Sequence, residues 1–232
     1  MLEMGTGEVP IVPSATVVPV RDGPTGLEVL LLQRNVALKH MGGEWVFPGG
    51  RIDPADYRVP GDHDRAALEA AMRETQEEAG VCIQPEQLHF LSHWTTPEGA
   101  RRRYSTWFFL AVLPADQEIT VDGGEISAHR WVRPADAFAE IRDTASPFRL
   151  MPPTFVSLVD LAEFADCVSA QHALRKRRPR RYAPRMILLE GGVCFLYEDD
   201  AGYESVSESV SGPRHRTYMI ENQLEYIREV AE

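Results

Sequence analysis

The segment from Asp64 to Ala79 constrains the fold more than any other part of this 232-residue chain. It contains strong helix formers and neither Gly nor Pro, and Gly80 follows it directly, where a helix commonly ends. The helical spacing of its apolar and small side chains predicts one buried face, made of Leu68, Ala71, Met72 and Thr75. The rest of the chain therefore has to supply a core that covers this face.

Short β-branched and aliphatic runs lie on both sides of this helix. The predicted strands are Thr16–Val20, Val29–Leu32, His89–Trp94, Ser105–Val112 and His129–Val132, and Trp45–Phe47 is a short apolar stretch before Pro48. A second long helix is predicted over Thr154–Arg175, because apolar residues again repeat along one stripe.

The last quarter of the chain has a different composition. Residues 175–185 hold seven of the 24 Lys and Arg residues, and no Asp or Glu lies between Asp166 and Glu190. We interpret this basic run as a solvated linker; a phosphate-contacting patch and a self-association surface are the alternatives. Beyond it we predict strands over Met186–Leu189, Val193–Tyr197 and Thr217–Ile220. A short terminal helix is predicted over Gln223–Val230.

The composition argues against several classes of protein. The chain has 35 acidic and 24 basic residues and a formal charge of -11, so a general affinity for nucleic acid is not expected. No apolar run approaches the ~20 residues of a membrane span, and the N-terminal residues do not resemble a secretory signal. The three Cys residues are widely spaced and form no CxxC pattern, which fits a reducing compartment. We therefore expect a cytoplasmic globular protein.

Three carboxylates converge near the end of the first helix. Glu74, Glu77 and Glu78 stand at positions i, i+3 and i+4, which places them on one side. Such like charges repel one another unless a cation lies among them, and Mg²⁺ takes oxygen ligands from carboxylates and substrate phosphates. Arg73 lies one turn before Glu77 and can orient its carboxylate. A solvated helix face is the alternative, and it is the better interpretation of the helix taken alone.

Two motifs read together resemble the Nudix box. Its pattern is Gly, five residues, Glu, seven residues, then Arg-Glu-apolar-x-Glu-Glu-x-Gly-apolar; here Pro48-Gly49-Gly50 precedes Arg73-Glu74-x-x-Glu77-Glu78-x-Gly80-Val81, with Thr75 at the first apolar position. The first half departs from the pattern, because Asp56 stands at the Glu position and 16 residues separate it from Arg73. The additional residues, within 57–65, lengthen the loop before the helix and leave the spacing of the charged residues unchanged.

The flanking residues are similar to the coenzyme A diphosphatase branch of the Nudix hydrolases. The similarity covers about residues 12–165 and rests on Leu30–Arg34, His40–Asp53, Trp94–Pro97, Arg102–Phe109, Glu125 and Trp131. It implies an α/β fold, a Nudix α/β/α sandwich with a mixed sheet, over residues 10–165, and a C-terminal extension over residues 166–232.

The resemblance also implies a function. The expected enzyme is a Mg²⁺- or Mn²⁺-dependent hydrolase that cleaves the diphosphate bond of a nucleoside diphosphate linked to another group. Coenzyme A or acyl-coenzyme A is the favoured substrate, with 3′,5′-ADP and 4′-phosphopantetheine or its acyl form as products. Hydrolysis of ADP-ribose, NADH or another nucleotide is the first alternative. A non-catalytic Nudix-fold sensor that binds a nucleotide is the second.

Individual residues receive roles by the same resemblance. The metal ligands would be the Gly50 carbonyl, Glu74, Glu77 and Glu78, and Arg73 would position a carboxylate. Glu77, Glu78 and Glu125 are the candidate general bases, and the sequence does not choose among them; Asp122 competes with Glu125 in the same loop. The candidate cations for substrate phosphates are Arg34, Arg101 and Arg103, since alternation in a strand would point Arg102 away from its neighbours.

We also expect a homodimer. A small isolated sheet is marginal in water, and its edges carry unpaired backbone groups that a second subunit can satisfy. Residues 186–232 would contribute to the contact. Packing of this sheet on its own catalytic domain is the alternative.

Overall fold

Two β-sheets organise the chain, for which a computed structural model describes residues 8–229. Predictions that touch residues 1–7 and 230–232 lie outside this range. The larger sheet has the strand order β3-β2-β1-β6-β5-β8, with β4 beside β1 and β7 beside β2. Its strands are β1 (Ile11–Gly23), β2 (Gly26–Arg34), β3 (Trp45–Val46), β4 (Gly49–Arg51), β5 (Leu88–Thr95), β6 (Arg103–Val112), β7 (Ile126–Val132) and β8 (Arg180–Tyr182). Because β1–β6 and β5–β8 are parallel and the other pairs antiparallel, the sheet is mixed.

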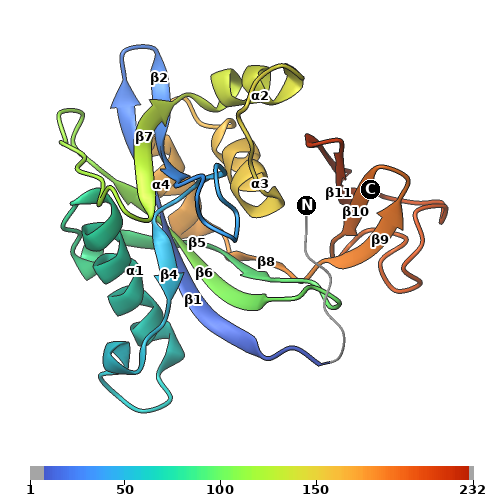
Figure 1. The fold of residues 1–232 in the computed structure, drawn as a ribbon, viewed down its shortest axis with the longest axis horizontal. Helices are drawn as coiled ribbons and strands as arrows, with labels where there is room; N and C mark the ends of the chain where they lie inside the picture. Colours follow the sequence, from blue (N-terminus) through green and yellow to red (C-terminus); the bar gives the residue numbers. More distant parts are fainter. Residues whose placement is uncertain (1–7, 230–232) are drawn as a thin grey trace.

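Helices cover both faces of this sheet (Figure 1). On one face lies α1 (His63–Ala79); the other face carries α2 (Pro134–Arg142), α3 (Pro152–Leu161) and α4 (Cys167–Lys176). Alternate residues of β2 serve the two layers: Leu30 and Leu32 pack with the alanines of α1, and Leu31 packs with the residues of α3 and α4. The predicted α/β/α sandwich is therefore confirmed. None of the helices described here is both long and apolar enough to cross a membrane.

Helix α1 has the predicted extent but a different buried face. Asp62 caps its start by accepting a hydrogen bond from the backbone N–H of Arg65, and Gly80 ends it with a φ of 70°. The fully buried positions are mostly alanines, namely Ala66, Ala67, Ala70, Ala71 and Ala79, together with Thr75. Leu68 and Met72 are only partly buried at the edge of this face. Small side chains allow the helix axis to approach the sheet closely, and the longer ones flank the contact.

The single helix expected over Thr154–Arg175 is wrong. The chain forms α3 and α4 instead, with a break after Leu161. Asp166 begins α4 by accepting a hydrogen bond from the backbone N–H of Ser169 at 2.7 Å, while the Ser169 hydroxyl lies 3.4 Å from the backbone N–H of Asp166. This capping arrangement starts a new helix without any Gly or Pro in the break.

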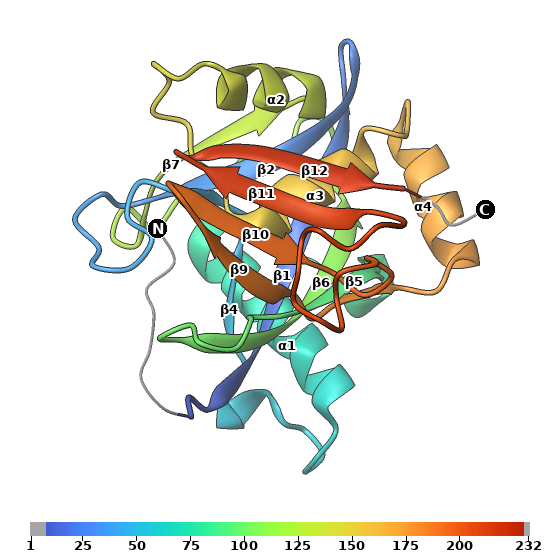
Figure 2. The same ribbon diagram turned by 90° about the vertical axis from the view of Figure 1, so that its right-hand side faces the viewer.

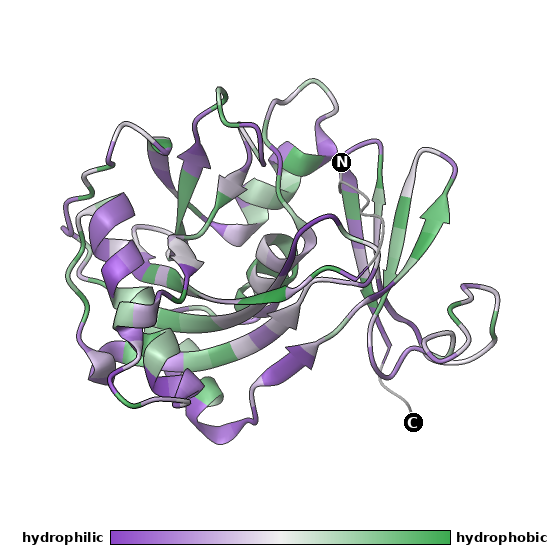
Figure 3. Cartoon of the chain, turned by 60° about the horizontal axis from the view of Figure 1, so that its bottom comes forward, coloured by the Kyte–Doolittle hydropathy of each residue, from purple (hydrophilic) through white to green (hydrophobic). Residues whose placement is uncertain are grey.

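The C-terminal extension forms a separate four-stranded antiparallel sheet. Its order is β12-β11-β10-β9, with β9 (Arg185–Leu189), β10 (Gly192–Leu196), β11 (His215–Ile220) and β12 (Gln223–Arg228). The first three strands were predicted, whereas the terminal helix is wrong because β12 pairs with β11. Glu221 and Asn222 both have positive φ and make the two-residue hairpin turn that returns the chain. In Figure 3 the hairpins of this sheet carry hydrophobic residues.

The extension packs on the larger sheet and its helices within the same chain (Figure 2). Tyr182 on β8 stacks on Trp94 of β5, with ring centroids 3.9 Å apart, and Tyr197 contacts Trp94 edge-on at 5.7 Å. The basic run is therefore not a solvated linker: residues 180–182 form a strand of the larger sheet, and Arg180 pairs with the buried carboxylate of Asp160.

The C-terminal extension contains a buried ion pair between Arg216 and Asp200. Arg216 donates from Nε and Nη2 to the two carboxylate oxygens of Asp200, each at 2.7 Å. Burial alone would raise the pKa of Asp200, but hydrogen bonds from Arg216 and from the backbone N–H groups of His215 and Gly202 outweigh burial and hold this pKa below its ordinary value. The pair therefore stabilises the folded chain when Asp200 is ionised.

Replacing Asp200 by Asn should lower the free energy of unfolding by about 3 kcal/mol, because Arg216 then stays buried without its counter-charge. Because the folded-state pKa lies below the ordinary value of 3.8, the contribution of Asp200 is complete at neutral pH and is lost as the pH falls below that value. Urea unfolding at neutral and acidic pH measures both effects. Asp136→Asn, in the exposed Arg133 pair, is the control and should change stability by less than about 0.5 kcal/mol. Equal losses in the two variants would contradict the prediction.

Candidate active site

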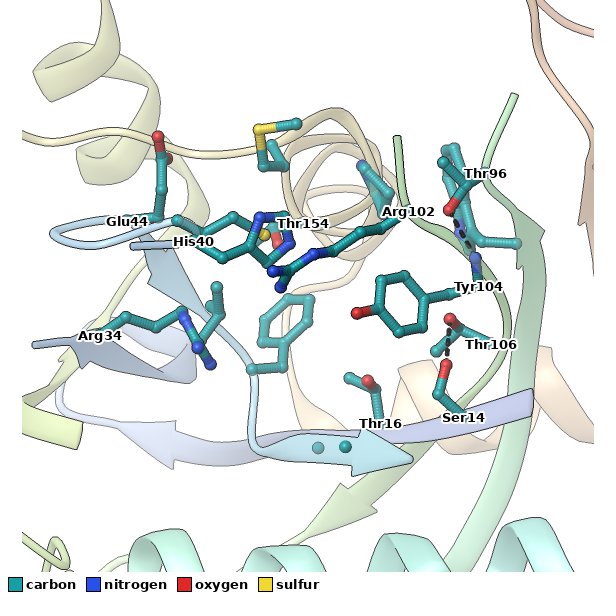
Figure 4. Close-up of a pocket in the computed structure, with 18 of the residues that line it drawn as sticks. Ser14, Thr16, Arg34, His40, Glu44, Thr96, Arg102, Tyr104, Thr106 and Thr154 are labelled. Atoms are coloured by element: carbon teal, nitrogen blue, oxygen red, sulfur yellow. Dashed lines mark hydrogen bonds between the residues drawn. The ribbon is translucent and has the colours of Figure 1, made fainter. Parts of the chain in front are cut away.

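One cavity of about 910 Å³ lies against β4 and the end of α1. Its lining comes from the loop after β2, from β4, α1, β5 and β6, from the start of α3, and from the C-terminal sheet. Figure 4 shows hydroxyl, basic and aromatic side chains directed into this space. We call the part of the lining formed by Glu74, Glu78 and Glu125 the acidic end.

Glu78 is a buried carboxylate at the acidic end. Its Oε2 accepts a hydrogen bond from the backbone N–H of Gly49 at 2.9 Å. Burial raises its pKa to about 8, and the nearby charges of Glu74 and Glu125 act in the same direction, while the Gly49 hydrogen bond and Arg34 oppose them. The ionised form is therefore disfavoured until a positive charge approaches.

Glu74 lies directly against the backbone of Gly50. A Cβ atom at this glycine would come within 2.5 Å of the Glu74 carboxylate, so no larger residue fits without moving that side chain. Burial raises the pKa of Glu74, and Arg73 counteracts the shift. Glu74 and Glu78, two partly desolvated carboxylates beside the backbone of Gly49 and Gly50, provide oxygen donors of the kind that a hard divalent cation takes. The residues present therefore fit Mg²⁺ or Mn²⁺.

Arg73 connects the loop after β4 with the acidic residues of α1. It donates from Nε and Nη2 to the two carboxylate oxygens of Asp56 at 3.2 and 3.0 Å, and from Nη2 to the carbonyl of Arg51 at 3.0 Å. From Nη1 it donates to Glu74 at 2.9 Å and to Glu77 at 3.1 Å. Asp56 is itself buried in the short 3₁₀ helix Pro54–Asp56. Sequence reasoning left the role of Asp56 open; the signal was its position in the motif, where five residues separate it from Gly50.

Glu77 does not lie with the other two carboxylates. Its side chain is 57% exposed, is paired with Arg73 and is not part of the cavity lining. Within residues 8–229, no three Asp, Glu, His or Cys side chains stand close enough together to hold a metal ion. The structure thus brings Gly50, Glu74 and Glu78 to the cavity and leaves Glu77 beside Arg73.

Glu125 reaches the cavity from the loop before β7. Its Oε1 pairs with Nη1 of Arg34 at 2.7 Å, so both predicted residues border the same space. Asp122 instead accepts hydrogen bonds from the backbone N–H groups of Gly124, Glu125 and Ile126 and shapes the loop. Of the two acidic residues, Glu125 is the one that lines the cavity.

Arg101 and Arg102 line the cavity, and Arg103 does not. Arg103 donates from Nε to the carbonyl of Thr96 at 3.2 Å. The expectation that groups Arg101 with Arg103 is wrong, because strand alternation begins only at Arg103 and the two preceding residues lie in a bend. In Figure 4, Arg102 extends across the cavity in the direction of His40.

Aromatic residues also belong to the cavity lining, and sequence reasoning missed their contribution. We call four of them, all almost fully buried, the aromatic wall: Trp94, Phe108, Phe195 and Tyr197. Phe195 and Tyr197 come from β10 and the residue after it, about 120 residues beyond the acidic helix. No motif in the sequence connects these aromatic residues with the Glu-rich segment.

Asp56→Asn should destabilise the protein by about 2 kcal/mol, because it removes charge from a nearly buried carboxylate that binds Arg73 at two points. Thermal or chemical unfolding measures the change. Glu69→Gln, on the helix that carries Arg73, breaks the pair with the exposed side chain of Arg58 and is the control, with an expected effect below about 0.5 kcal/mol. An Asp56 variant as stable as this control would rule out the anchoring role.

Comparison with known proteins identifies relatives of this chain. It is 28% identical over 177 residues, 61% of this chain and 58% of the relative, to putative nudix hydrolase 7 of Caenorhabditis elegans. It is 30% identical over 122 residues, 50% of this chain and 32% of the relative, to acyl-coenzyme A diphosphatase NUDT19 of Homo sapiens. With uncharacterized Nudix hydrolase NudL of Escherichia coli strain K12 it shares 31% identity over 116 residues, 50% of this chain and 54% of the relative. The chain thus spans less than two thirds of the length of each.

The fold has a counterpart among solved structures. A NUDIX hydrolase from Alicyclobacillus acidocaldarius superposes with a TM-score of 0.63 at 23% sequence identity, over 72% of this chain and 97% of that one. The NUDIX domain model matches residues 10–152, which include β1 to β7, α1 and both halves of the box. This chain belongs to the NUDIX domain family.

Proposed function

We propose that this protein is a Mg²⁺- or Mn²⁺-dependent diphosphatase that acts on a nucleoside diphosphate linked to another group. The observation that carries the proposal is the acidic end, where the buried Glu78 and Glu74 meet the Gly50 backbone. Arg34, Arg101 and Arg102 line the same cavity, so cations for substrate phosphates stand beside carboxylates for a metal. The family relationship supports the same chemistry.

The cation would be held by Glu74, Glu78 and the Gly50 carbonyl, with Glu77 as the further predicted ligand. When bound, it supplies charge stabilisation at the diphosphate and lowers the pKa of a bound water. Arg73, fixed by Asp56, holds the carboxylates of Glu74 and Glu77 in position. Glu78, Glu77 and Glu125 remain the candidates for the general base.

Coenzyme A or acyl-coenzyme A is the favoured substrate. The similarity to a human protein named as an acyl-coenzyme A diphosphatase supports this choice, although that similarity spans only half of the chain. The products would be 3′,5′-ADP and 4′-phosphopantetheine or its acyl form. We place this activity in the cytoplasm, in keeping with the three unpaired cysteines.

Glu78→Gln and Glu77→Gln should each lower kcat by about 100-fold or more while the protein stays folded, because each removes a negative charge predicted to hold the cation. Turnover is measured as the rate of product formation at saturating Mg²⁺ or Mn²⁺. Thermal melts check that each variant is folded. Glu69→Gln supplies the control from the same helix. Wild-type turnover by Glu77→Gln would remove Glu77 from the metal ligands, and wild-type turnover by Glu78→Gln would contradict the site.

A substrate panel tests specificity and the sensor alternative together. With coenzyme A, acyl-coenzyme A, ADP-ribose, NADH and nucleoside triphosphates, we expect the highest kcat/KM for the coenzyme A compounds. A preference for ADP-ribose would overturn the substrate and leave the mechanism intact. A ligand that binds in excess Mg²⁺ and is recovered uncleaved, with no turnover across the panel, would favour the non-catalytic sensor.

The homodimer remains a prediction, with residues 186–232 at the contact. The extension packs on the rest of the chain, and this already buries one face of the small sheet. The sheet therefore has less need of a second subunit. Light scattering of the full chain at micromolar concentration should give twice the monomer mass of 26.0 kDa. A mass of 26.0 kDa would contradict the dimer.

A further inference from the structure

Strand β9 forms one border of the small C-terminal sheet, and its outer edge has no strand beside it. Within residues 8–229, β9 pairs only with β10, so the backbone N–H and C=O groups on its other side lack a strand partner. In Figure 2 it lies at the border of the sheet opposite β12. Backbone groups on such an edge can pair with a strand of another chain.

Other strands at the borders of the two sheets are protected from such pairing. Strands β3, β4 and β8 span only two or three residues. The longer β7 and β12 carry charged side chains, Arg130 in β7 and Glu225 and Arg228 in β12. Short length and charged side chains are two of the means by which proteins prevent pairing between edges. Strand β9 has neither over residues 186–189, which are Met, Ile, Leu and Leu.

The apolar face of the small sheet continues to this edge. Leu188 of β9 pairs with Val193 of β10, and Val193 belongs to the buried core of the molecule. Leu188 itself is 65% exposed. The buried row of side chains therefore ends in a leucine that water surrounds, and covering this leucine would remove apolar surface from water.

The charges at the two ends of β9 are opposite. Arg185 begins the strand and Glu190 follows its last residue. Arg185 is held at this edge, because its Nη1 donates to the carbonyls of Tyr203 and Glu204 at 3.2 and 2.8 Å. Its ion pair with the Glu204 carboxylate is exposed to solvent and contributes little. When two copies of β9 run antiparallel, the basic end of each therefore lies beside the acidic end of the other.

We infer that β9 pairs with β9 of a second copy of this chain, antiparallel about a two-fold axis, and so joins the two small sheets into one. This contact rests on the homodimer of the proposed function. Paired residues share a face of the sheet, and an axis normal to the sheet keeps each face on its own side. The central residue must therefore pair with its own counterpart, and it is Ile187 or Leu188. Either choice places Arg185 opposite a residue adjacent to the partner's Glu190.

Leu188→Lys tests the contact, because it places two like charges near the two-fold axis. It should lower the association constant at least about tenfold and give a monomer at micromolar concentration. Light scattering across a dilution series measures the mass, and thermal melts check folding. Val168→Lys is the control, since Val168 is 72% exposed on α4, outside the small sheet, and this variant should dimerise as the wild type does.

Cysteine cross-linking identifies the axis and keeps the test decisive if Leu188→Lys disturbs folding. A Cys82→Ser background removes the exposed thiol and leaves the buried Cys167 and Cys194. In this background, Ile187→Cys or Leu188→Cys should form a disulfide-linked dimer under mild oxidation, at least about tenfold faster than Val168→Cys. The faster of the two variants gives the register of the paired strands.

The outcomes separate the β9 contact from the dimer itself. Equal dimerisation of Leu188→Lys and Val168→Lys, with no faster cross-linking at position 187 or 188, would overturn the contact and leave the homodimer standing. A wild type that stays monomeric at every concentration would overturn both. Neither result bears on the proposed hydrolysis, since residues 185–189 contribute nothing to the cavity lining.

Discussion

The stacking of Tyr182 on Trp94 fixes β8 against β5 in the larger sheet, and Tyr197 of the C-terminal extension packs edge-on against both rings. Tyr182 ends the short strand that adds the extension to the larger sheet, and the chain turns from there into the small sheet. Both rings are almost fully buried, so the contact combines a large apolar area with a fixed orientation. With this anchor, β10 brings Phe195 and Tyr197 to the cavity; without it, the cavity would be open on that side.

At the acidic end of the cavity, the main constraint is electrostatic. Burial and mutual repulsion disfavour the ionised forms of Glu74 and Glu78, and Arg73 and Arg34 supply the compensating charge from two sides. Arg73 in turn depends on Asp56, which stands on the loop that carries the insertion in the box. The added residues form the loop and the first part of α1, so the shared residues of the box keep their spacing along the helix. The cavity thus has an acidic end, where a cation is favoured, and buried aromatic rings elsewhere in its lining.

The sequence predicted local patterns well and long-range placement poorly. Strand alternation and helix-forming composition identified α1 and most strands, and the box identified the family that the matched model confirms. The break between α3 and α4 was missed because a capping pair, rather than a Gly or Pro, makes it. Similarly, β12 resembled a helix because its identity depends on the hairpin turn and on pairing with β11. The aromatic wall could not be predicted, because tertiary packing alone brings β10 beside β5 and β6.

The parallel pairing of β1 with β6 has a consequence for how the chain folds. Ile11 pairs with Arg103, 92 residues later, and the register continues without interruption to Val20 and Val112. The centre of the larger sheet therefore forms only after a long loop has closed, at an entropic cost that local contacts do not offset beforehand. The hairpins β9–β10 and β11–β12, by contrast, join near neighbours in sequence. Refolding should accordingly be limited by assembly of the central strands, with a rate closer to that of β-rich proteins than of helical bundles.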